Sequence, residues 1–213
     1  MKAVILANSF RDGGRCIGGI VLSESGSPVL ENNRARWIRP VIDESHHEIP
    51  NDLAANLSLL DIVEFKALKD IPVNHHTENV LIDKHSLKRS GKAGLSVLDA
   101  LTDNTHFKTI FGNKGKAVSE EAIAGLKYSL SLIKPDSVEI TERTYDDSIF
   151  PQIRMTLRYH DINYDLPVTD PVFLYNFKRN HNLLNNIKKF YLTLSLAAPH
   201  EHWYYKLVAG VIY

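Results

Sequence analysis

Residues 32–41, NNRARWIRPV, place an arginine in a row with a tryptophan. If this stretch forms a strand, Trp37, Arg39 and Val41 share one face, because side chains alternate with a period of two. Two kinds of chemistry fit this row. Arg39 pairs with an acid inside the fold, since a buried guanidinium keeps its charge and needs a partner. Alternatively, Trp37 stacks a base and Arg39 binds phosphate, as in proteins that bind single-stranded nucleic acid.

Further polar and basic residues surround the first predicted turn and would enlarge an anion-binding face. These residues are Asn8, Ser9, Arg11, Arg15 and Cys16. The predicted nucleic-acid or anion-binding set consists of Ser9, Arg11, Arg15, Trp37 and Arg39. The alternative is that Trp37 belongs to the core and Arg39 pairs with an internal acid, Glu78 or Asp170. The two hypotheses are compatible, because a buried ion pair can form the floor of a pocket.

Acidic residues provide the second candidate set. Glu78 and Asp170 could serve as acid–base groups or hold a metal. Asp170, however, precedes Pro171, and this step is typical of a helix N-cap followed by the first helical residue. We therefore predict that Glu78, Asn79 and Asp170 form a structural pair or pocket. We predict no catalytic residue.

Histidine and cysteine do not indicate a metal site or a cofactor. The ten histidines fall in predicted loops without a ligand pattern. The single cysteine, Cys16, excludes an internal disulfide and begins an apolar strand, which favours a small buried side chain over a nucleophile. Residues 112–119, GNKGKAVS, are similar to a phosphate-binding loop, but the glycine spacing does not fit and no Ser or Thr follows Lys116.

The composition is that of a globular protein. Hydrophobic residues make up 44% and charged residues 23% of the 213 positions, and 25 basic residues balance 25 acidic ones. A basic field over the whole protein is therefore absent, so a nucleic-acid site must be a local patch. The chain has no apolar run of membrane-spanning length and no signal-peptide pattern at its start, so we expect a cytoplasmic protein without membrane contact.

Strand patterns occur in two blocks, with helical spacing between them. The Gly13-Gly14 pair predicts a hairpin turn, and the Gly18-Gly19 pair predicts a bulge or sharp bend. Strand–helix–strand alternation is missing, so a mainly β fold with a helical insert, arranged as two small barrels, fits better than a parallel sheet. The expected domains are an N-terminal barrel, a helical connector and a C-terminal barrel with one inserted helix, at residues 1–90, 91–127 and 128–213.

Motifs in order over nearly the full chain resemble the prokaryotic family described as a dual OB-containing domain. They are ILANSFRDGGRCIGGIVL, WIRPV, LLDIVEF, HTENVLI, YSLSLIKP, YDLPVTDP and LSLAAP with YYKLVAGVIY. The resemblance implies two OB-like barrels packed in one compact unit. It also implies a role near nucleic acids or in bacterial conflict or defence systems, and it brings no catalytic motif.

We therefore expect a non-enzymatic binding module for single-stranded nucleic acid or a nucleotide, with no cofactor. One alternative is an enzyme that processes nucleic acid or nucleotides with Glu78 and Asp170. Another is a protein-interaction scaffold whose last strand, at residues 204–213, pairs with a strand of a partner protein.

Overall fold

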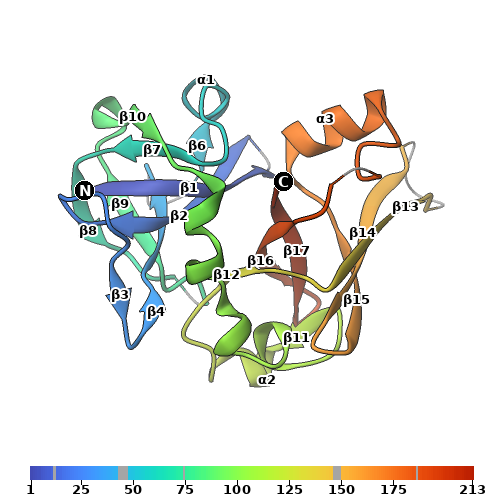
Figure 1. Ribbon diagram of the computed structural model, residues 1–213. Coiled ribbons are helices and arrows are strands. Elements are labelled where there is room, and N and C mark those ends of the chain that lie inside the picture. The colour runs from blue at the N-terminus through green and yellow to red at the C-terminus, as the bar shows by residue number, and fades with distance from the viewer. Residues whose placement is uncertain (12, 43–47, 74, 146–149, 186) are drawn as a thin grey trace. The chain divides into compact units, whose positions relative to one another are not determined.

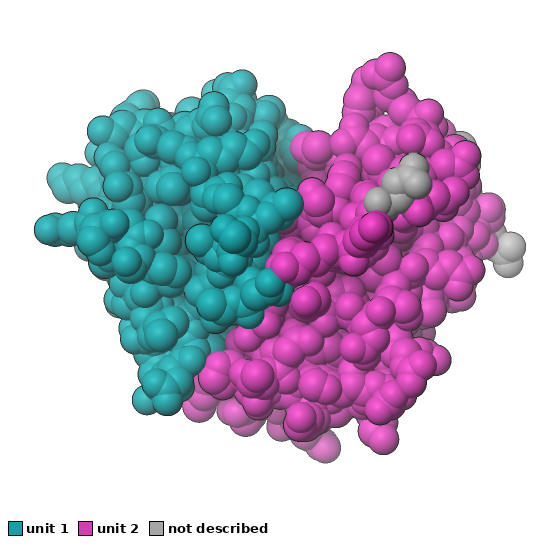
Figure 2. Space-filling view, in the orientation of Figure 1, with its two compact units in different colours: residues 1–101, 128–130 teal, residues 102–127, 131–213 magenta. Residues whose placement is uncertain are grey.

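The computed structural model describes residues 1–213 except 12, 43–47, 74, 146–149 and 186 (Figure 1). The chain divides into two compact units, which Figure 2 shows in two colours. Unit 1 comprises residues 1–101 and 128–130, and unit 2 comprises residues 102–127 and 131–213. Both units consist mainly of β-strands, which confirms the predicted fold class. The segment expected as a connector is shared between the units, because residues 91–101 belong to unit 1 and residues 102–127 to unit 2.

Unit 1 is built on one eight-stranded sheet with the order β10-β7-β1-β2-β5-β9-β8, in which β6 also pairs with β2. Neighbouring strands are antiparallel except β5 and β9, which are parallel. A small ribbon of β3 and β4 and the short helix α1 complete the unit. The bounds are β1 Lys2–Arg11, β2 Gly14–Leu22, β3 Leu30–Glu31, β4 Arg34–Ala35, β5 Trp37–Val41, β6 Ile49–Pro50, α1 Asn51–Ala54, β7 Asp61–Glu64, β8 Ala67–Asp70, β9 Asn79–Ile82 and β10 Lys88–Lys92.

One apolar core collects side chains from most strands of this sheet. Its strand residues are Ala3, Ile5, Ile17, Val21, Ile38, Ile49, Val63, Val80 and Ile82. Along each strand they alternate with residues of the other face, as the period of two requires. Because strands from across the sheet contribute to the same core, the sheet wraps around it in the manner of a small barrel.

The glycine pair of β2 permits this curvature. The register of β1 against β2 shifts between Ile5, opposite Gly19, and Ala7, opposite Gly18, so the predicted bulge is present. A Cβ at Gly19 would lie 2.3 Å from the carbonyl oxygen of Val4. The two backbones therefore approach more closely than any side chain at this position allows.

Unit 2 contains a four-stranded sheet, β11-β17-β16-β12, and a three-stranded sheet, β13-β14-β15. Val168, directly after β15, forms a parallel bridge with Val208 of β17 and so joins the two sheets. The bounds are β11 Ala117–Ser119, α2 Glu120–Ile123, β12 Leu130–Ile133, β13 Ser137–Arg143, β14 Gln152–Tyr159, β15 Ile162–Pro167, α3 Pro171–Arg179, β16 Tyr191–His200 and β17 Trp203–Ile212.

Helices are few and short, and the helical insert differs from the prediction. Residues 95–112 form four separate 3₁₀ turns, η2 Leu95–Val97, η3 Asp99–Leu101, η4 Asp103–Thr105 and η5 Ile110–Gly112. Ser, Thr and Asp recur in this stretch, and their side chains compete for backbone groups that an α-helix would use. Helix α3 begins as predicted, with Asp170 as N-cap, and it ends at Arg179. The described part of the chain contains no helix of the length and apolarity that a membrane span requires.

We expect Gly19→Ala to destabilise unit 1 by about 2–3 kcal/mol or more, because the new methyl group would overlap the Val4 carbonyl. The measurement is urea unfolding of the full chain at neutral pH. Gly91→Ala is the matched control: Gly91 also lies in a strand of unit 1, and a Cβ there meets only the Ile62 side chain at an ordinary 3.7 Å. Equal midpoints for the two variants would contradict the close-approach argument.

Candidate functional site

Trp37 and Arg39 lie on one face of β5, as the alternation predicts. Ile38 between them points into the core of unit 1, so both side chains point to the opposite face of the sheet. That face is covered, because Trp37 is only 7% and Arg39 only 3% exposed. The register of the parallel pair places Asn79, also buried, beside Arg39. Trp37 therefore has little ring surface to offer a base.

Residues 128–130 supply part of this cover. Glu78 Oε1 accepts hydrogen bonds from the backbone amides of Ser129 at 2.6 Å and Leu130 at 3.2 Å. Glu78 Oε2 accepts a third, from the Ser129 hydroxyl at 2.8 Å. Arg39 Nη2 donates to that same hydroxyl at 3.0 Å. The Ser129 hydroxyl thus links the Arg39 guanidinium to the Glu78 carboxylate, the acid that the sequence predicts as its partner.

Arg34 and Cys16 add to this cluster. The Arg34 guanidinium lies 4.3 Å from the centre of the Tyr128 ring and donates to the Leu130 carbonyl oxygen at 2.7 Å. Cys16 Sγ accepts a hydrogen bond from Arg39 Nη1. The cysteine is therefore partly polar in its contacts, although the sequence favoured a purely apolar role.

The other predicted binding residues of unit 1 whose side chains are described have hydrogen-bond partners near the first hairpin and helix α1. The Asn8 side-chain amide donates to the carbonyl oxygens of Ala54 and Leu57, at 2.9 and 2.8 Å. Ser9 is buried, and Arg15 donates to Asn51 at 2.9 Å. The side chain of Arg11 lies outside the part of the structure that is described. Asn8 and Arg15 thus bind residues of helix α1 and of the loop that follows it.

Asp170 belongs to unit 2 and has a structural role there. Its Oδ1 accepts hydrogen bonds from the amides of Val172 and Phe173, which caps α3, and its Oδ2 accepts from the Val211 amide at 3.0 Å. Glu78 binds backbone amides of unit 1 in a similar way. Glu78 and Asp170, the two carboxylates that the enzymatic alternative requires, thus each accept hydrogen bonds from backbone amides of their own unit.

A basic pocket of about 620 Å³ in unit 2 was not predicted. Four basic side chains, one carboxylate and three tyrosines dominate its lining: Lys114, Lys116, Arg143, Arg154, Asp165, Tyr145, Tyr164 and Tyr205. The residues come from the loop before β11 and from β13, β14, β15 and β17, with Tyr145 just after β13. Four cations face one carboxylate, so the pocket carries a local positive excess although the whole chain is neutral.

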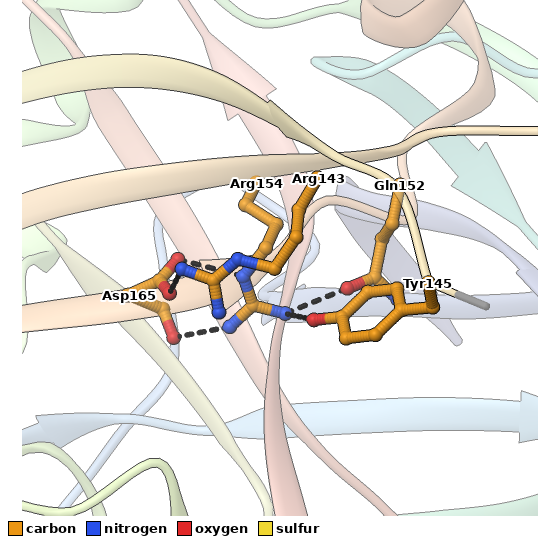
Figure 3. Close-up of polar contacts among 5 residues, drawn as sticks. All are labelled: Arg143, Tyr145, Gln152, Arg154 and Asp165. Carbon is orange, nitrogen blue, oxygen red and sulfur yellow. Dashed lines mark hydrogen bonds and ion pairs between the residues drawn. The ribbon is translucent and has the colours of Figure 1, made fainter.

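Arg154 lies at the centre of a polar network in the lining of this pocket (Figure 3). Its Nε donates to Asp165 Oδ1 and its Nη2 to the Asp165 carbonyl oxygen, both at 2.7 Å, while Nη1 donates to Gln152 Oε1 at 2.6 Å. Asp165 Oδ2 also lies 3.0 Å from Arg143 Nη2. The Arg154 side chain is 8% exposed and that of Arg143 is 53% exposed. Arg154 is thus held by protein acceptors, whereas Arg143 faces solvent.

The loop that carries Lys114 and Lys116 is held by a buried lysine. Lys206 is fully buried in β17 and donates through Nζ to the carbonyl oxygen and to the side-chain Oδ1 of Asn113, each at 2.9 Å. Asn113 Oδ1 also accepts from the Gly115 amide at 2.8 Å. Burial lowers the pKa of Lys206 from its ordinary value to about 7. Burial also raises the pKa of Tyr164, whose ring centre lies 5.0 Å from Lys206 Nζ.

A larger pocket in unit 1, of about 770 Å³, is less suited to an anion. Two of its three lysines share one carboxylate, because Glu64 pairs with Lys2 at 3.6 Å and with Lys88 at 3.4 Å. The hydrogen bond from Lys88 lowers the pKa of Glu64. For a metal, no group of three or more His, Cys, Asp or Glu side chains among the described residues has a suitable arrangement.

Comparison with known proteins identifies a family, and comparison with solved structures finds remote likenesses. The family model described as "Dual OB-containing domain" matches residues 1–211. No curated protein matches the chain. The structure described as "Crystal structure of p204 HINb domain" is 11% identical, with 100% of this chain and 96% of that chain covered and a TM-score of 0.34. One described as "Structural mimicry for functional antagonism" is 15% identical, with 95% and 85% covered and a TM-score of 0.30.

Glu78→Ala is expected to destabilise the protein by about 2–5 kcal/mol, because it removes the acceptor of three hydrogen bonds that hold residues 128–130. Ser129→Ala should cost about 1–2 kcal/mol, since it removes only the bridging hydroxyl. Urea midpoints measure both changes. Glu139→Ala, at an exposed position of β13, is the control and should stay within about 0.5 kcal/mol of the parent protein. A Glu78→Ala midpoint that matches this control would contradict the role assigned to the carboxylate.

Lys206→Met tests the buried cation through the pH dependence of stability. Below pH 7 the folded and unfolded states both hold the proton, so the cost of burying the charge is fully present. Between pH 7 and about 10 the unfolded state binds more protons, so the parent protein should gain stability relative to the variant by at most about 1.4 kcal/mol per pH unit. Urea unfolding of both proteins at several pH values measures this difference. A difference that stays constant between pH 7 and 10 would show that the pKa of Lys206 is not lowered.

Proposed function

Because the chain belongs to the dual OB-containing domain family, we propose that it is a non-enzymatic binding module for single-stranded nucleic acid or a nucleotide. OB folds bind oligonucleotides in many proteins, which makes this ligand class the natural starting point. The observation that carries the proposal is the basic, tyrosine-lined pocket of unit 2.

The chemistry of the pocket suits this ligand class. Proteins that bind single strands combine basic side chains, which contact phosphates, with aromatic rings, on which bases stack. Lys114, Lys116 and Arg143 are exposed and supply the charge. Tyr145 and Tyr205 lie in the same lining and supply the rings.

The proposed ligand contacts in unit 2 differ from the binding residues that the sequence predicts in unit 1. Trp37 and Arg39 are buried, so they support unit 1 and do not form an open stacking platform. Their contribution to binding would be indirect, through the stability of the sheet. A single-strand ligand would therefore lose little affinity from a conservative change at Trp37 that leaves the fold intact.

The rival functions have less support in the geometry. The enzymatic alternative needs free carboxylates, and Glu78 and Asp170 each bind backbone amides. The scaffold alternative needs an open final strand, and β17 lies between β11 and β16 in its sheet. The prokaryotic, cytoplasmic setting and a place in a bacterial conflict or defence system complete the proposal, and their support is the family resemblance and the composition.

The test is a binding screen of the full chain against single- and double-stranded DNA and RNA and against nucleotides, at two salt concentrations. We expect binding that weakens as salt rises, because lysines release counterions from phosphates. Lys114→Ala with Lys116→Ala should lower the slope of log affinity against log salt by about 1.4 for a single strand, since each phosphate contact contributes about 0.7.

The control removes two exposed lysines that do not line the pocket, as Lys84→Ala with Lys178→Ala. It has the same change in net charge as the test variant, so a slope that falls equally in both would point to a general charge effect. No binding to any member of the screen at low salt would overturn the proposed function.

A further inference from the structure

We propose that the unit 2 pocket recognises a phosphomonoester carried by a nucleotide, either free or at the end of a single strand. This inference rests on the proposed function and names the chemical group that the pocket selects. It concerns Lys114, Lys116 and Arg143, which would contact the phosphate, and the tyrosines, which would contact the base.

The charge of the pocket fits a phosphomonoester better than an internal phosphate. Arg143 and Arg154 share Asp165, at 3.0 and 2.7 Å, so this triad keeps one net positive charge. Lys114 and Lys116 add two more at the mouth of the same pocket. A phosphomonoester carries a charge of about −1.5 to −2 at neutral pH and presents three acceptor oxygens, whereas an internal diester carries a single charge.

The size of the pocket fits one nucleotide. Pockets for small ligands range over about 300–1,000 Å³, and this pocket has a volume of about 620 Å³. A single nucleotide fits a pocket of this size. A continuous strand needs a groove that extends beyond the bound nucleotide in both directions. A pocket of this volume therefore favours a terminal nucleotide or a free one.

The arrangement is also fixed before any ligand arrives. All three nitrogens of the Arg154 guanidinium group donate to protein acceptors, so this side chain holds Asp165 and thereby orients Arg143. The loop with Lys114 and Lys116 is held at Asn113 by Lys206, and the Lys206 amide donates to the Lys116 carbonyl oxygen at 3.0 Å. A site whose donors are already in place loses less entropy when it binds an anion.

Tyr205 and Tyr145 extend the site beyond the phosphate. Tyr205 lies in β17 next to Lys206, and the Lys116 Nζ lies 5.9 Å from the centre of its ring. Tyr145 places its hydroxyl 3.5 Å from Arg154 Nη1, so its ring stands at the guanidinium cluster that Figure 3 shows. An aromatic ring beside the basic groups offers a base a stacking surface of any sequence.

The experiment measures binding of the full chain to oligothymidylates about twelve nucleotides long, a length within the usual range for one OB fold. Three strands are compared: one with a 5′-phosphate, one with a 3′-phosphate and one with hydroxyl groups at both ends. Thymidine monophosphate and thymidine serve as competitors. We expect at least one phosphorylated strand to bind roughly tenfold more tightly than the hydroxyl strand, and we expect thymidine monophosphate to displace it while thymidine does not.

Arg143→Met and Arg158→Met are a matched pair for the same measurement. Their side chains are 53% and 54% exposed and each pairs with one aspartate, Asp165 and Asp161, but only Arg143 lines the pocket. Arg143→Met should abolish the preference for the terminal phosphate, and Arg158→Met should keep it. Circular dichroism of both variants verifies that they fold.

The outcomes separate this inference from the proposed function. If all three strands bind with equal affinity, the terminal-phosphate inference is wrong while the binding module remains. A preference that survives Arg143→Met would also overturn it, because the phosphate would then bind elsewhere. Phosphorylated strands could bind poorly while thymidine monophosphate binds well, with an affinity that falls in Arg143→Met. In that case the ligand of the pocket is the free nucleotide. If nothing binds, both proposals fall.

Discussion

Unit 1 depends on one carboxylate that binds a distant part of its own chain. Glu78 accepts hydrogen bonds from the backbone amides of residues 129 and 130 and from the Ser129 hydroxyl. The same hydroxyl accepts a hydrogen bond from Arg39. A guanidinium cannot lose its proton at ordinary pH, so a nearly buried arginine must be satisfied by polar contacts. The Ser129 hydroxyl meets part of this need and at the same time links the arginine to the acid. The same contacts hold residues 128–130 against the face of the sheet that carries Arg39.

Unit 2 handles buried charge in a different way. Arg154 has a direct acidic partner and uses its donors on protein groups, and Lys206 is satisfied by two oxygens of one asparagine. These two side chains hold the pocket together and have few donors left for a ligand. The exposed Arg143 and the loop lysines have donors available. Buried cations thus support the pocket, and exposed cations line it. This arrangement can bind an anion even though the whole chain has no net charge.

Much of the fold could be predicted from the sequence, because its determinants are local. Alternating apolar residues predicted most of the longer strands, the paired glycines predicted the bulge, and Asp170 before Pro171 predicted the start of α3. Strand β10 could not be predicted in this way, because KRSGK has no apolar alternation and pairs with β7 through its backbone. Alternation also placed Trp37 and Arg39 on one face without indicating that residues 128–130 cover it.

The unit 2 pocket could not be predicted, because strand register creates it. Arg143 lies opposite Gln152, and Arg154 opposite Pro167, so β13, β14 and β15 bring their polar side chains onto one face. Register describes how two strands pair, so the sequence of one strand alone does not reveal it. The GNKGK loop is similar to a phosphate motif, but its glycine spacing does not fit that motif. Its lysines reach the pocket through the contacts of Asn113 with Lys206, which no spacing rule contains.

Unit 1 is built from two segments that are separated in the sequence, residues 1–101 and residues 128–130. Residues 1–101 can collapse around their core while the ribosome is still producing the chain, but residues 128–130 come later. Glu78 and Ser129 are 51 positions apart, and closing so long a loop carries an entropic cost that nearby contacts do not have. We therefore expect residues 128–130 to join unit 1 after the local contacts of the sheet have formed. Interactions formed after the rate-limiting step slow unfolding without speeding folding. The contacts between Glu78 and Ser129 are accordingly expected to slow the unfolding of unit 1 and to change its folding rate little.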